Sequence, residues 1–420
     1  MGSASSFSLA DGWTEFLRKN PGRIICHRET IKEGEELYPI PVGLLSSVFR
    51  QFAEDLNSVA LTSVDFNFVM EVTTSMATSY ASKKDRLSTF RELLEEYIGR
   101  PLLSLRVGES ITDGSLLYNG TGILLCNLEA RVEKCSGGGD SYMQSIAYYV
   151  KSLPEKGTAT QFPCFLLELT GTTFYVSGVV NTVSQIICNP LSPAYQLLNH
   201  PEHVMATGMA RLFASLKKNI PSLRSPHSLL SPLSSFPYVT IFRCPLSGEE
   251  ISFRYRERLR GRLVFSGEIM PCGPDIVVKF SRNYNSEVHS YCHSKGFAPA
   301  LKSVQNFGDY IFVVMEKLKH RDLQHPDLAD ERIRGQFNDI LGALKMKNYV
   351  HGDMRACNIQ FDEAAKKVYL IDFDWAGVED EAVYPTFMNS SITWPPGVAC
   401  GQPLRHEHDV YWVNTLFESL

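Results

Sequence analysis

The last third of the chain carries polar residues whose types and spacing fit the transfer of a phosphoryl group. Asp353 follows His351 by two residues, and Asn358 lies five residues beyond Asp353. This is the His-x-Asp-x-x-x-x-Asn spacing of a kinase catalytic loop, in which the aspartate accepts the proton of the attacking hydroxyl and the asparagine binds metal. An apolar run, residues 368–371, leads into Asp372, which stands where kinases hold a second metal ligand. We therefore expect a site for ATP and Mg²⁺.

Neighbouring residues complete the expected catalytic and metal-binding set. Arg355 lies inside the loop and is a candidate catalytic residue. Asp374 replaces the glycine of an Asp-Phe-Gly motif and adds a carboxylate that can bind metal. Gly352 stands where protein kinases usually have arginine, as in kinases that act on small molecules. Further along, Asp409 is expected near the start of a helix, where it would brace the catalytic loop.

Candidates for nucleotide binding lie upstream of the loop. Residues 276–280 have the pattern of a buried strand and include Lys279, which resembles the strand lysine that kinases place on the phosphates. Glu287, on an expected helix just after this strand, is the natural ion-pair partner for Lys279. Met315 and Glu316 end an apolar strand and would form the hinge around the nucleotide.

A run of alternating arginines stands where a glycine-rich loop would precede the strand lysine. Its members are Arg254, Arg256, Arg258, Arg260 and Arg262. Since residues two apart on a strand share a face, all of them would lie together if the strand runs through. Two interpretations stay open: a solvated face at the edge of a sheet, or phosphate binding by Arg260 and Arg262 at the tip.

Length and composition indicate a folded protein of more than one domain. The chain has 420 residues, 44% of them hydrophobic and 21% charged. Its formal net charge of −5 gives no overall attraction to nucleic acid. Interleaved prolines and serines over 220–237 cannot sustain a helix or a central strand. We therefore expect an N-terminal α/β domain over 1–219 with its core at about 84–216, a linker over 220–237, and a second domain over 238–420.

Hydrophobic patterns predict the secondary structure of both domains. In the first, strands are expected at 64–71, 115–118, 121–128, 165–169 and 174–178, and helices at 44–56, 84–97, 142–152 and 194–216. In the second, strands at 251–258, 263–269, 276–280 and 310–315 precede helices at 328–346 and from 408. Strands followed by helices are the order of a two-lobed kinase fold. Its C-terminal lobe is expected to be shortened, because no Ala-Pro-Glu follows the motif region.

These motifs resemble those of fungal kinase-like proteins related to Crinkler-type effectors. That family has His-Gly-Asp-x-Arg-x-x-Asn followed by Asp-Phe-Asp-Trp-Ala-Gly, and here the second motif spans 372–377. Tyr384-Pro and Trp394-Pro follow it. The resemblance covers the chain from about residue 105 to the end. It implies an ATP- and Mg²⁺-dependent phosphotransferase of protein-kinase type, with Ser or Thr as the acceptor, but names no substrate.

The same resemblance implies a nuclease-like first domain of the restriction-endonuclease, or PD-(D/E)xK, type. Asp113, Glu129 and Arg131 correspond to the Asp and Glu-x-Lys that hold Mg²⁺ and position water in such enzymes. Gln144 and Tyr148 match the Gln-x-x-x-Tyr of related nucleases. Because an arginine does not give up its proton, Arg131 in place of lysine indicates a degenerate site.

Three classes of function remain. The chain could be a kinase that acts on a protein or a small molecule, using the residues named above. It could be a metal-dependent nuclease that cleaves nucleic acid and is regulated by its kinase-like half. It could also be a pseudokinase that binds partners without catalysis. The intact lysine, aspartate and asparagine set favours the first class.

The sequence also predicts where the protein acts. A basic segment followed by an apolar run is absent from the N-terminus, which excludes a signal peptide, and no stretch of about 18 apolar residues could span a membrane. The ten cysteines are scattered and form no Cys-x-x-Cys pair, as in reduced proteins of the cytoplasm or nucleus. Gly2 with Ser6 fits the pattern for N-myristoylation, so a lipid anchor at Gly2 is a further expectation.

Overall fold

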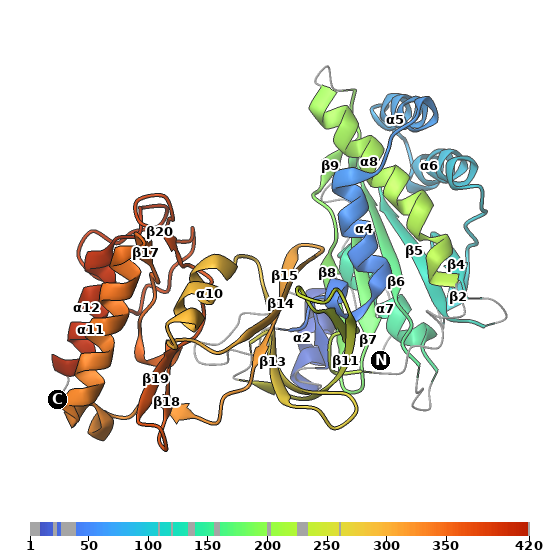
Figure 1. Ribbon diagram of the computed structural model, residues 1–420. Helices are drawn as coiled ribbons and strands as arrows, with labels where there is room; N and C mark the ends of the chain where they lie inside the picture. Colours follow the sequence, from blue (N-terminus) through green and yellow to red (C-terminus); the bar gives the residue numbers. More distant parts are fainter. Residues whose placement is uncertain are drawn as a thin grey trace. The chain divides into compact units, whose positions relative to one another are not determined.

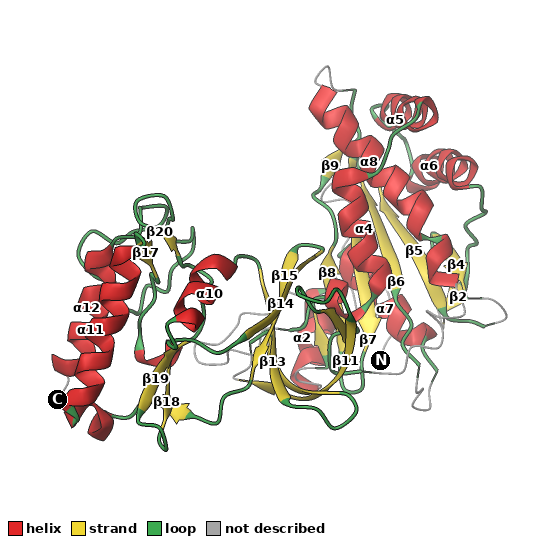
Figure 2. Ribbon diagram, in the orientation of Figure 1, coloured by secondary structure: helices red, strands yellow, loops and turns green. Residues whose placement is uncertain are grey.

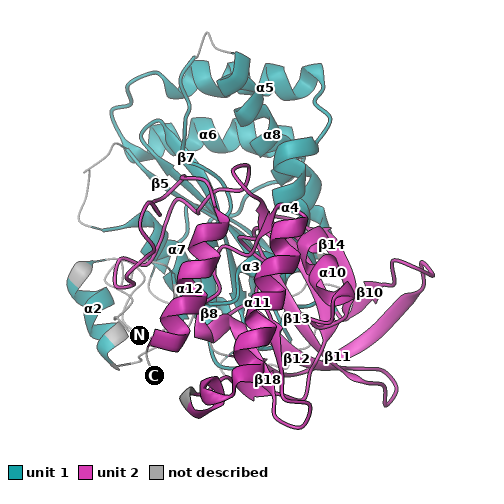
Figure 3. Ribbon diagram, turned by 60° about the vertical axis from the view of Figure 1, so that its left-hand side comes forward, with its two compact units in different colours: residues 1–239 teal, residues 240–420 magenta. Residues whose placement is uncertain are grey.

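The structure is a computed structural model that describes residues 9–19, 23–26, 39–107, 110–118, 121–132, 139–154, 160–199, 203–224, 234–259 and 262–418. Contacts divide the chain into two compact units, residues 1–239 and 240–420 (Figure 3). Tyr238, the expected start of the second domain, belongs to unit 1, because its N–H donates to Leu44 O at 2.9 Å and its hydroxyl accepts from Arg50 Nε at 2.5 Å. The predictions for Gly2 and Arg260 lie outside the described residues.

Unit 1 is built on a mixed sheet of seven strands within the described part of the chain (Figure 1). The strands are β1 (Ile24–Ile25), β4 (Gly114–Leu117), β5 (Leu124–Arg131), β6 (Cys164–Thr170), β7 (Thr173–Asn181), β8 (Ile186–Pro190) and β9 (Tyr195–Gln196). Their order is β1-β8-β7-β6-β5-β4, with β9 beside β7. The pairs β5–β6 and β1–β8 are parallel, and the other pairs are antiparallel. A separate short ladder joins β2 (Arg106–Val107) to β3 (Ser110–Ile111).

Helices cover both faces of this sheet. They are α2 (Ala10–Lys19), α3 (Val42–Leu45), α4 (Ser47–Ser58), α5 (Ser63–Met76), α6 (Lys83–Ile98), α7 (Ser141–Ser152) and α8 (His203–Asn219). On β6, the ring of Phe165 meets Phe49 of α4 with centroids 5.1 Å apart, whereas the next residue, Leu166, packs in a core cluster with α7. Because neighbouring strand residues point to opposite faces, α4 and α7 lie on opposite sides of the sheet. The mixed α/β class is confirmed.

Two of the expected elements in unit 1 are wrong. Residues 64–71 are not a strand but part of α5, whose start is fixed when the Asp65 carboxylate accepts the Thr62 N–H at 2.7 Å. The expected helix at 194–216 is divided, because Tyr195 and Gln196 pair with β7 and α8 begins only at His203. No helix among the described residues has the length and apolarity needed to cross a membrane.

The first half of unit 2 is an antiparallel sheet of six strands in the order β10-β11-β12-β13-β15-β14. Their bounds are β10 (Ile241–Arg243), β11 (Glu250–Leu259), β12 (Val264–Ile269), β13 (Asp275–Ser281), β14 (Leu301–Phe307) and β15 (Tyr310–Glu316). One helix, α10 (Ser286–Ser294), follows β13. Sequence patterns predict four of these strands, and β10 and β14 are additional.

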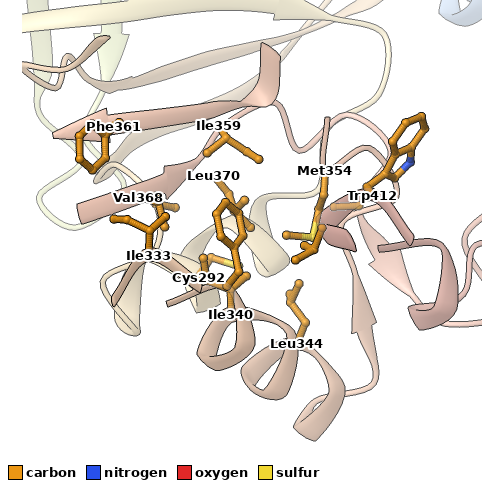
Figure 4. Packing of buried hydrophobic residues seen from close by; sticks show 14 of the residues in the cluster. Cys292, Ile333, Ile340, Leu344, Met354, Ile359, Phe361, Val368, Leu370 and Trp412 are labelled. Atoms are coloured by element: carbon orange, nitrogen blue, oxygen red, sulfur yellow. The ribbon is translucent and has the colours of Figure 1, made fainter. Parts of the chain in front are cut away.

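The second half of unit 2 contains two long helices, two small sheets and long connecting loops (Figure 2). It contains α11 (Glu331–Met346), α12 (His406–Glu418), the ladder β16 (Arg321–Asp322), β18 (Ile359–Asp362) and β19 (Lys367–Leu370), and the pair β17 (Tyr349–Val350) and β20 (Gly377–Val378). Ile333, Ile340 and Leu344 recur at helical spacing on α11 and pack with Ile359 and Leu370 of the hairpin (Figure 4). This core holds in place the loop that connects β17 to β18.

Candidate functional site

β13 carries Lys279 into the interior of unit 2. Val278 and Phe280 on either side of it are buried, so Lys279 leaves the sheet on the opposite face. The lysine is nevertheless only 8% exposed. Its Nζ forms ion pairs with Asp372 Oδ1 and with Asp374 Oδ1, the second at 2.6 Å. The predicted phosphate-binding lysine therefore meets both predicted metal-binding aspartates.

The residue between these two aspartates anchors them. Phe373 is fully buried, stacks on His289 of α10 with ring centroids 4.5 Å apart, and meets His351 edge-on at 5.1 Å. Its carbonyl accepts the N–H of Asn285 at 3.1 Å. Asp372 has φ of +68°, in the left-handed region that non-glycine residues rarely adopt. The packing of Phe373 holds this conformation against its backbone cost.

Close packing of charges shifts the pKa values of this cluster. Burial lowers the pKa of Lys279, but attraction to Asp372 and Asp374 outweighs it and the net shift is upward. Burial raises the pKa of Asp372, yet Lys279 and Arg262 bring it below its usual value. For Asp374, burial together with repulsion from Asp372 exceeds the effect of Lys279, and the pKa rises to about 6. Asp374 also accepts a hydrogen bond from Ser281 Oγ at 2.7 Å. The single positive charge of Lys279 therefore does not fully neutralise the negative charges of both carboxylates.

The loop between β17 and β18 presents Asp353 with hydrogen-bond donors on both carboxylate oxygens. Arg355 donates from Nε to Oδ1 and from Nη2 to Oδ2, the latter at 2.7 Å. Asn358 Nδ2 donates to Oδ2 at 2.7 Å and to the Asp353 carbonyl at 3.0 Å. The Ile371 N–H donates to the Asn358 carbonyl at 3.0 Å, which holds the loop beside the strand end that leads into Asp372. The structure thus brings Asp353, Arg355 and Asn358 together beside the strand end that leads into Asp372.

Asp409, fully buried on α12, braces this loop as expected. Its Oδ2 accepts the His351 N–H at 2.7 Å, and its Oδ1 accepts the Gly352 N–H at 2.9 Å. His351 Nε2 hydrogen-bonds with the Ile371 carbonyl at 3.1 Å. Burial raises the pKa of Asp409 to about 7, against the lowering by its two N–H donors.

Close packing explains why the second position of the loop motif is a glycine, Gly352. Gly352 has φ of +78°, and a Cβ atom added there would lie 1.9 Å from Leu404 Cδ2. Glycine adopts this conformation without steric cost, and its missing side chain leaves room for the leucine. An arginine at this position could not fit the loop against Leu404.

The alternating arginines do not share one continuous face. Arg254 and Arg256 both pair with Glu268 on β12, at 3.3 and 2.9 Å. The pairing of β11 with β12 shifts between Tyr255 and Glu257, so the condition under which all five arginines would share a face is not met. The side chains of Arg254 and Arg256 are exposed, which fits the interpretation as a solvated face at the edge of a sheet, and the ion pairs with Glu268 are an addition to it.

Arg262 is placed differently. Its Nη1 lies 3.5 Å from Asp372 Oδ2, and its carbonyl accepts a hydrogen bond from Arg258 Nε at 2.7 Å. Arg262 therefore lies beside a predicted metal-binding aspartate, and phosphate binding by Arg262 stays a prediction. Arg260, the other tip residue, lies outside the described residues.

The expected ion pair between Lys279 and Glu287 is wrong. Glu287 is exposed on α10, and its Oε1 accepts a hydrogen bond from the Tyr349 hydroxyl at 2.5 Å. Two residues further along, His289 is buried against the core. Residues two apart on a helix point in nearly opposite directions, so a helix that buries His289 turns Glu287 outward. Lys279 is instead neutralised by the two aspartates.

Met315 and Glu316 end β15 as expected. Met315 is buried and Glu316 is exposed. The Glu316 N–H donates to the Ala300 carbonyl at 2.9 Å, and the following Lys317 N–H donates to the Asp275 carbonyl at 3.3 Å. Both N–H groups therefore have partners in the sheet, and a hinge role for Met315 and Glu316 stays a prediction.

Unit 1 holds a second buried pair of carboxylates. Asp113 Oδ2 accepts the Ala130 N–H at 2.8 Å and lies 2.5 Å from Lys83 Nζ. Glu129 is 2% exposed, and its Oε1 has no hydrogen-bond partner among the described residues. Burial raises the pKa of Glu129 well above its usual value, repulsion from Asp113 adds to this, and Lys83 opposes it. The two predicted metal ligands of the nuclease-like site are therefore neighbours.

The other three residues of that predicted site lie in one hydrogen-bonded chain. Arg131 Nη2 donates to Gln144 Oε1 at 2.9 Å, and Gln144 Nε2 donates to the Tyr148 hydroxyl at 3.3 Å. The same hydroxyl donates to the Ile111 carbonyl at 2.8 Å. Burial raises the pKa of Tyr148 to about 12, and the charge of Glu129 adds to the shift. The Arg131 side chain thus donates to Gln144, and Lys83 is the cation that pairs with the carboxylate of Asp113.

Lys83 and Ser281 are site residues that sequence reasoning missed. Lys83 opens α6 directly after its N-cap residue Ser82, within a charged run that reads as an exposed helix start. Its role depends on how α6 packs, which spacing along the chain does not reveal. Ser281 ends β13, two residues after Lys279, and that spacing on one strand face could have identified it.

Comparisons with known proteins add only a distant likeness. No protein-family model matches the chain, and no curated protein matches it. Among solved structures, the kinase PK-1 of the Cydia pomonella granulovirus is similar over 40% of this chain and 69% of its own, with 15% sequence identity and a TM-score of 0.34. At this TM-score and identity the likeness decides nothing about the fold or the function of this chain.

Proposed function

We propose that unit 2 is a kinase-like phosphotransferase that uses ATP and Mg²⁺ and acts on a hydroxyl group, either Ser or Thr of a protein or a small molecule. The observation that carries the proposal is the contact of Lys279 with Asp372 and Asp374, beside a loop that presents Asp353 and Asn358. Phosphoryl transfer asks the protein mainly for positioning and charge neutralisation. This cluster offers both.

The donor atoms fit magnesium and a nucleotide. Asp372, Asp374 and Asn358 offer the hard oxygens that Mg²⁺ prefers. Among the described residues, no three His, Cys, Asp or Glu side chains form a complete metal site, so phosphate oxygens would have to complete the coordination. The raised pKa of Asp374 indicates that the cluster can accept further positive charge. When bound, ATP and Mg²⁺ supply the phosphoryl group and the cation that neutralises it.

The residues of the loop and the sheet have distinct roles in this proposal. A carboxylate oxygen of Asp353 accepts the proton of the attacking hydroxyl. Arg355 and Asn358 orient that carboxylate through the hydrogen bonds described above. Lys279 and Arg262 would bind phosphate oxygens of ATP. Both cations lie at Asp372, which would hold the Mg²⁺ ion that accompanies those phosphates.

The test uses the full-length chain with radiolabelled ATP and Mg²⁺, measuring transfer to the protein itself, to water, to general protein acceptors and to small molecules that carry hydroxyl groups. Asp353→Asn should lower turnover by a factor of about 100 or more, because a general base contributes that much. It should leave the rise in Tm caused by ATP and Mg²⁺ intact, whereas Lys279→Met should abolish both. Asp309→Asn, at an exposed turn, is the matched control.

Two outcomes would contradict the proposal in different ways. If ATP with Mg²⁺ leaves the Tm of the unaltered chain unchanged, unit 2 has no nucleotide site. If the Tm rises but no transfer to any acceptor is detected, unit 2 is a pseudokinase that binds nucleotide without catalysis.

A second candidate function, metal-dependent cleavage of nucleic acid by unit 1, is favoured by two observations. Lys83 reaches Asp113 at 2.5 Å and supplies the ammonium that Arg131 does not. The orphaned Oε1 of Glu129 is a further oxygen that a cation would satisfy. Incubation with Mg²⁺ or Mn²⁺ and DNA or RNA should then give cleavage that is lost in Asp113→Asn and in Lys83→Met. Absence of cleavage by the unaltered chain would refute this candidate.

A further inference from the structure

A cluster of aromatic side chains lies beside the catalytic loop. The ring centroid of Trp394 is 5.7 Å from that of Trp375, 5.7 Å from that of Trp412 on α12, and 6.4 Å from that of Tyr384. Trp394 Nε1 donates a hydrogen bond to the Asn389 carbonyl at 2.9 Å. The indole of Trp394 is thus fixed by segments that are well separated in the sequence.

Arg355 joins this cluster to Asp353. Its Cζ lies 5.2 Å from the ring centroid of Trp394, within the range of a cation–π contact. Its Nε and Nη2 donate to the Asp353 carboxylate. A guanidinium is planar, so its edge can donate hydrogen bonds while its face stacks on a ring. Both contacts therefore exist at once, and the side chain is 22% exposed.

We infer that Trp394 is a positioning residue for the catalytic base, because its indole holds Arg355 and Arg355 fixes the carboxylate plane of Asp353. This inference rests on the proposed function of unit 2. Asn358 donates to only one of the two carboxylate oxygens, Oδ2, and cannot set the rotation of the group alone. Without the indole, the guanidinium gains rotational freedom and the carboxylate turns with it.

The inference separates two properties of the site. The nucleotide side consists of Lys279, Asp372 and Asp374, and no aromatic or hydrogen-bond contact joins Trp394 to these residues among the described contacts. Trp394 contacts Arg355 directly but reaches Asp374 only through the neighbouring residue Trp375, so a change at Trp394 acts on the base more than on ATP binding. The expected effect falls on kcat, while the KM for ATP stays nearly constant.

The experiment measures ATP turnover by the full-length chain and three variants. Trp394→Leu should lower kcat by about 10- to 100-fold, the usual effect of a misplaced catalytic group, with a KM for ATP within about twofold of the unaltered value. Trp394→Phe keeps a ring under the guanidinium and should recover most of the loss. Phe387→Leu changes an aromatic residue on the same segment that is 92% exposed, and should behave like the unaltered chain.

A second measurement tests the contact independently of activity. The Tm changes of Trp394→Leu and Arg355→Met should not add in the double variant, because each change removes the same contact. Additive Tm changes, or an unaltered kcat in Trp394→Leu, would overturn the inference while leaving the proposed function in place. A kcat that Trp394→Phe does not restore would assign Trp394 a structural role only. No turnover by the unaltered chain would overturn both.

Discussion

Replacement of Lys279 by methionine should destabilise unit 2, and more at pH 8 than at pH 5. Lys279 is 8% exposed and pairs with two aspartates whose side chains are 19% and 25% exposed. Methionine keeps the length of the side chain but leaves Asp372 and Asp374 without the ammonium. Removing one partner of a buried ion pair costs about 3–5 kcal/mol. Because Arg262 remains 3.5 Å from Asp372, we expect the lower end, about 3 kcal/mol.

The cost depends on pH because the carboxylates can bind protons. With Lys279 present, the pKa of Asp372 lies below its usual value and that of Asp374 is about 6. Without Lys279 both pKa values rise. Below its raised pKa, a carboxylate of the folded variant binds a proton that the unfolded chain binds only at lower pH, so the stability deficit shrinks as the pH falls. Above the raised pKa values of Asp372 and Asp374 both carboxylates are charged, and the variant shows the full loss of unfolding free energy.

Thermal unfolding of the full-length chain between pH 5 and pH 8 measures this effect. A cost of about 3 kcal/mol corresponds to a fall in Tm of about 6–12 °C for a unit of this size. Lys345→Met, on the exposed side of α11, is the matched control and should change Tm by about 2 °C or less. Equal Tm values for the two variants at pH 8, or a larger deficit at pH 5, would refute the reasoning.

Two further predictions concern the contacts that brace the loop between β17 and β18. Gly352→Ala should cost about 2–4 kcal/mol, because the added methyl group meets Leu404 and the backbone is left-handed, whereas Gly401→Ala, with φ of +73° but nothing within 4 Å, should cost about 1 kcal/mol. Urea unfolding compares the two, and equal costs would contradict the packing argument. Asp409→Asn leaves one loop N–H, such as that of His351, without an acceptor and should cost about 1–3 kcal/mol at pH 5. The pKa of Asp409 in the folded chain is about 7, so the unaltered chain loses stability as the pH rises toward 7, whereas Asp409→Asn does not. The difference in the free energy of unfolding between the two chains should therefore be smaller at pH 8 than at pH 5. A larger difference at pH 8 would contradict the raised pKa of Asp409.

Residues whose roles depend on short spacing could be predicted from the sequence. Asp353 and Asn358 lie in one loop, and the loop closes on itself through the hydrogen bond between them. Asp372 follows a strand that pairs with the strand after this loop, so the hairpin brings it to the same place. Lys279 could be predicted because its short apolar strand resembles the strand that carries the phosphate-binding lysine of kinases. Each of these depends on local pattern more than on long-range packing.

Residues whose roles depend on packing could not be predicted. The position of Glu287 is set by the rotation of α10, which follows from the burial of His289 against Phe373 and not from the residue's distance to Lys279 along the chain. Lys83 reaches Asp113 from a helix that begins well before it in sequence. Strand propensity at residues 64–71 was overruled by a helix start at Thr62. In each case a contact between distant segments, or a cap, outweighed the local pattern.

The stretch after Asp372 bears on the choice between a kinase and a pseudokinase. Asp409 accepts the N–H groups of two loop residues, Leu404 packs where the loop has only glycine, and Trp394 supports Arg355. All three contacts are made to the loop that carries Asp353, and none is needed merely to bind a nucleotide. A group that must act in a transition state benefits from such fixed positioning, because it needs no reorganisation at the moment of reaction. The bracing is therefore consistent with the catalytic role proposed for Asp353, which the turnover of Asp353→Asn tests.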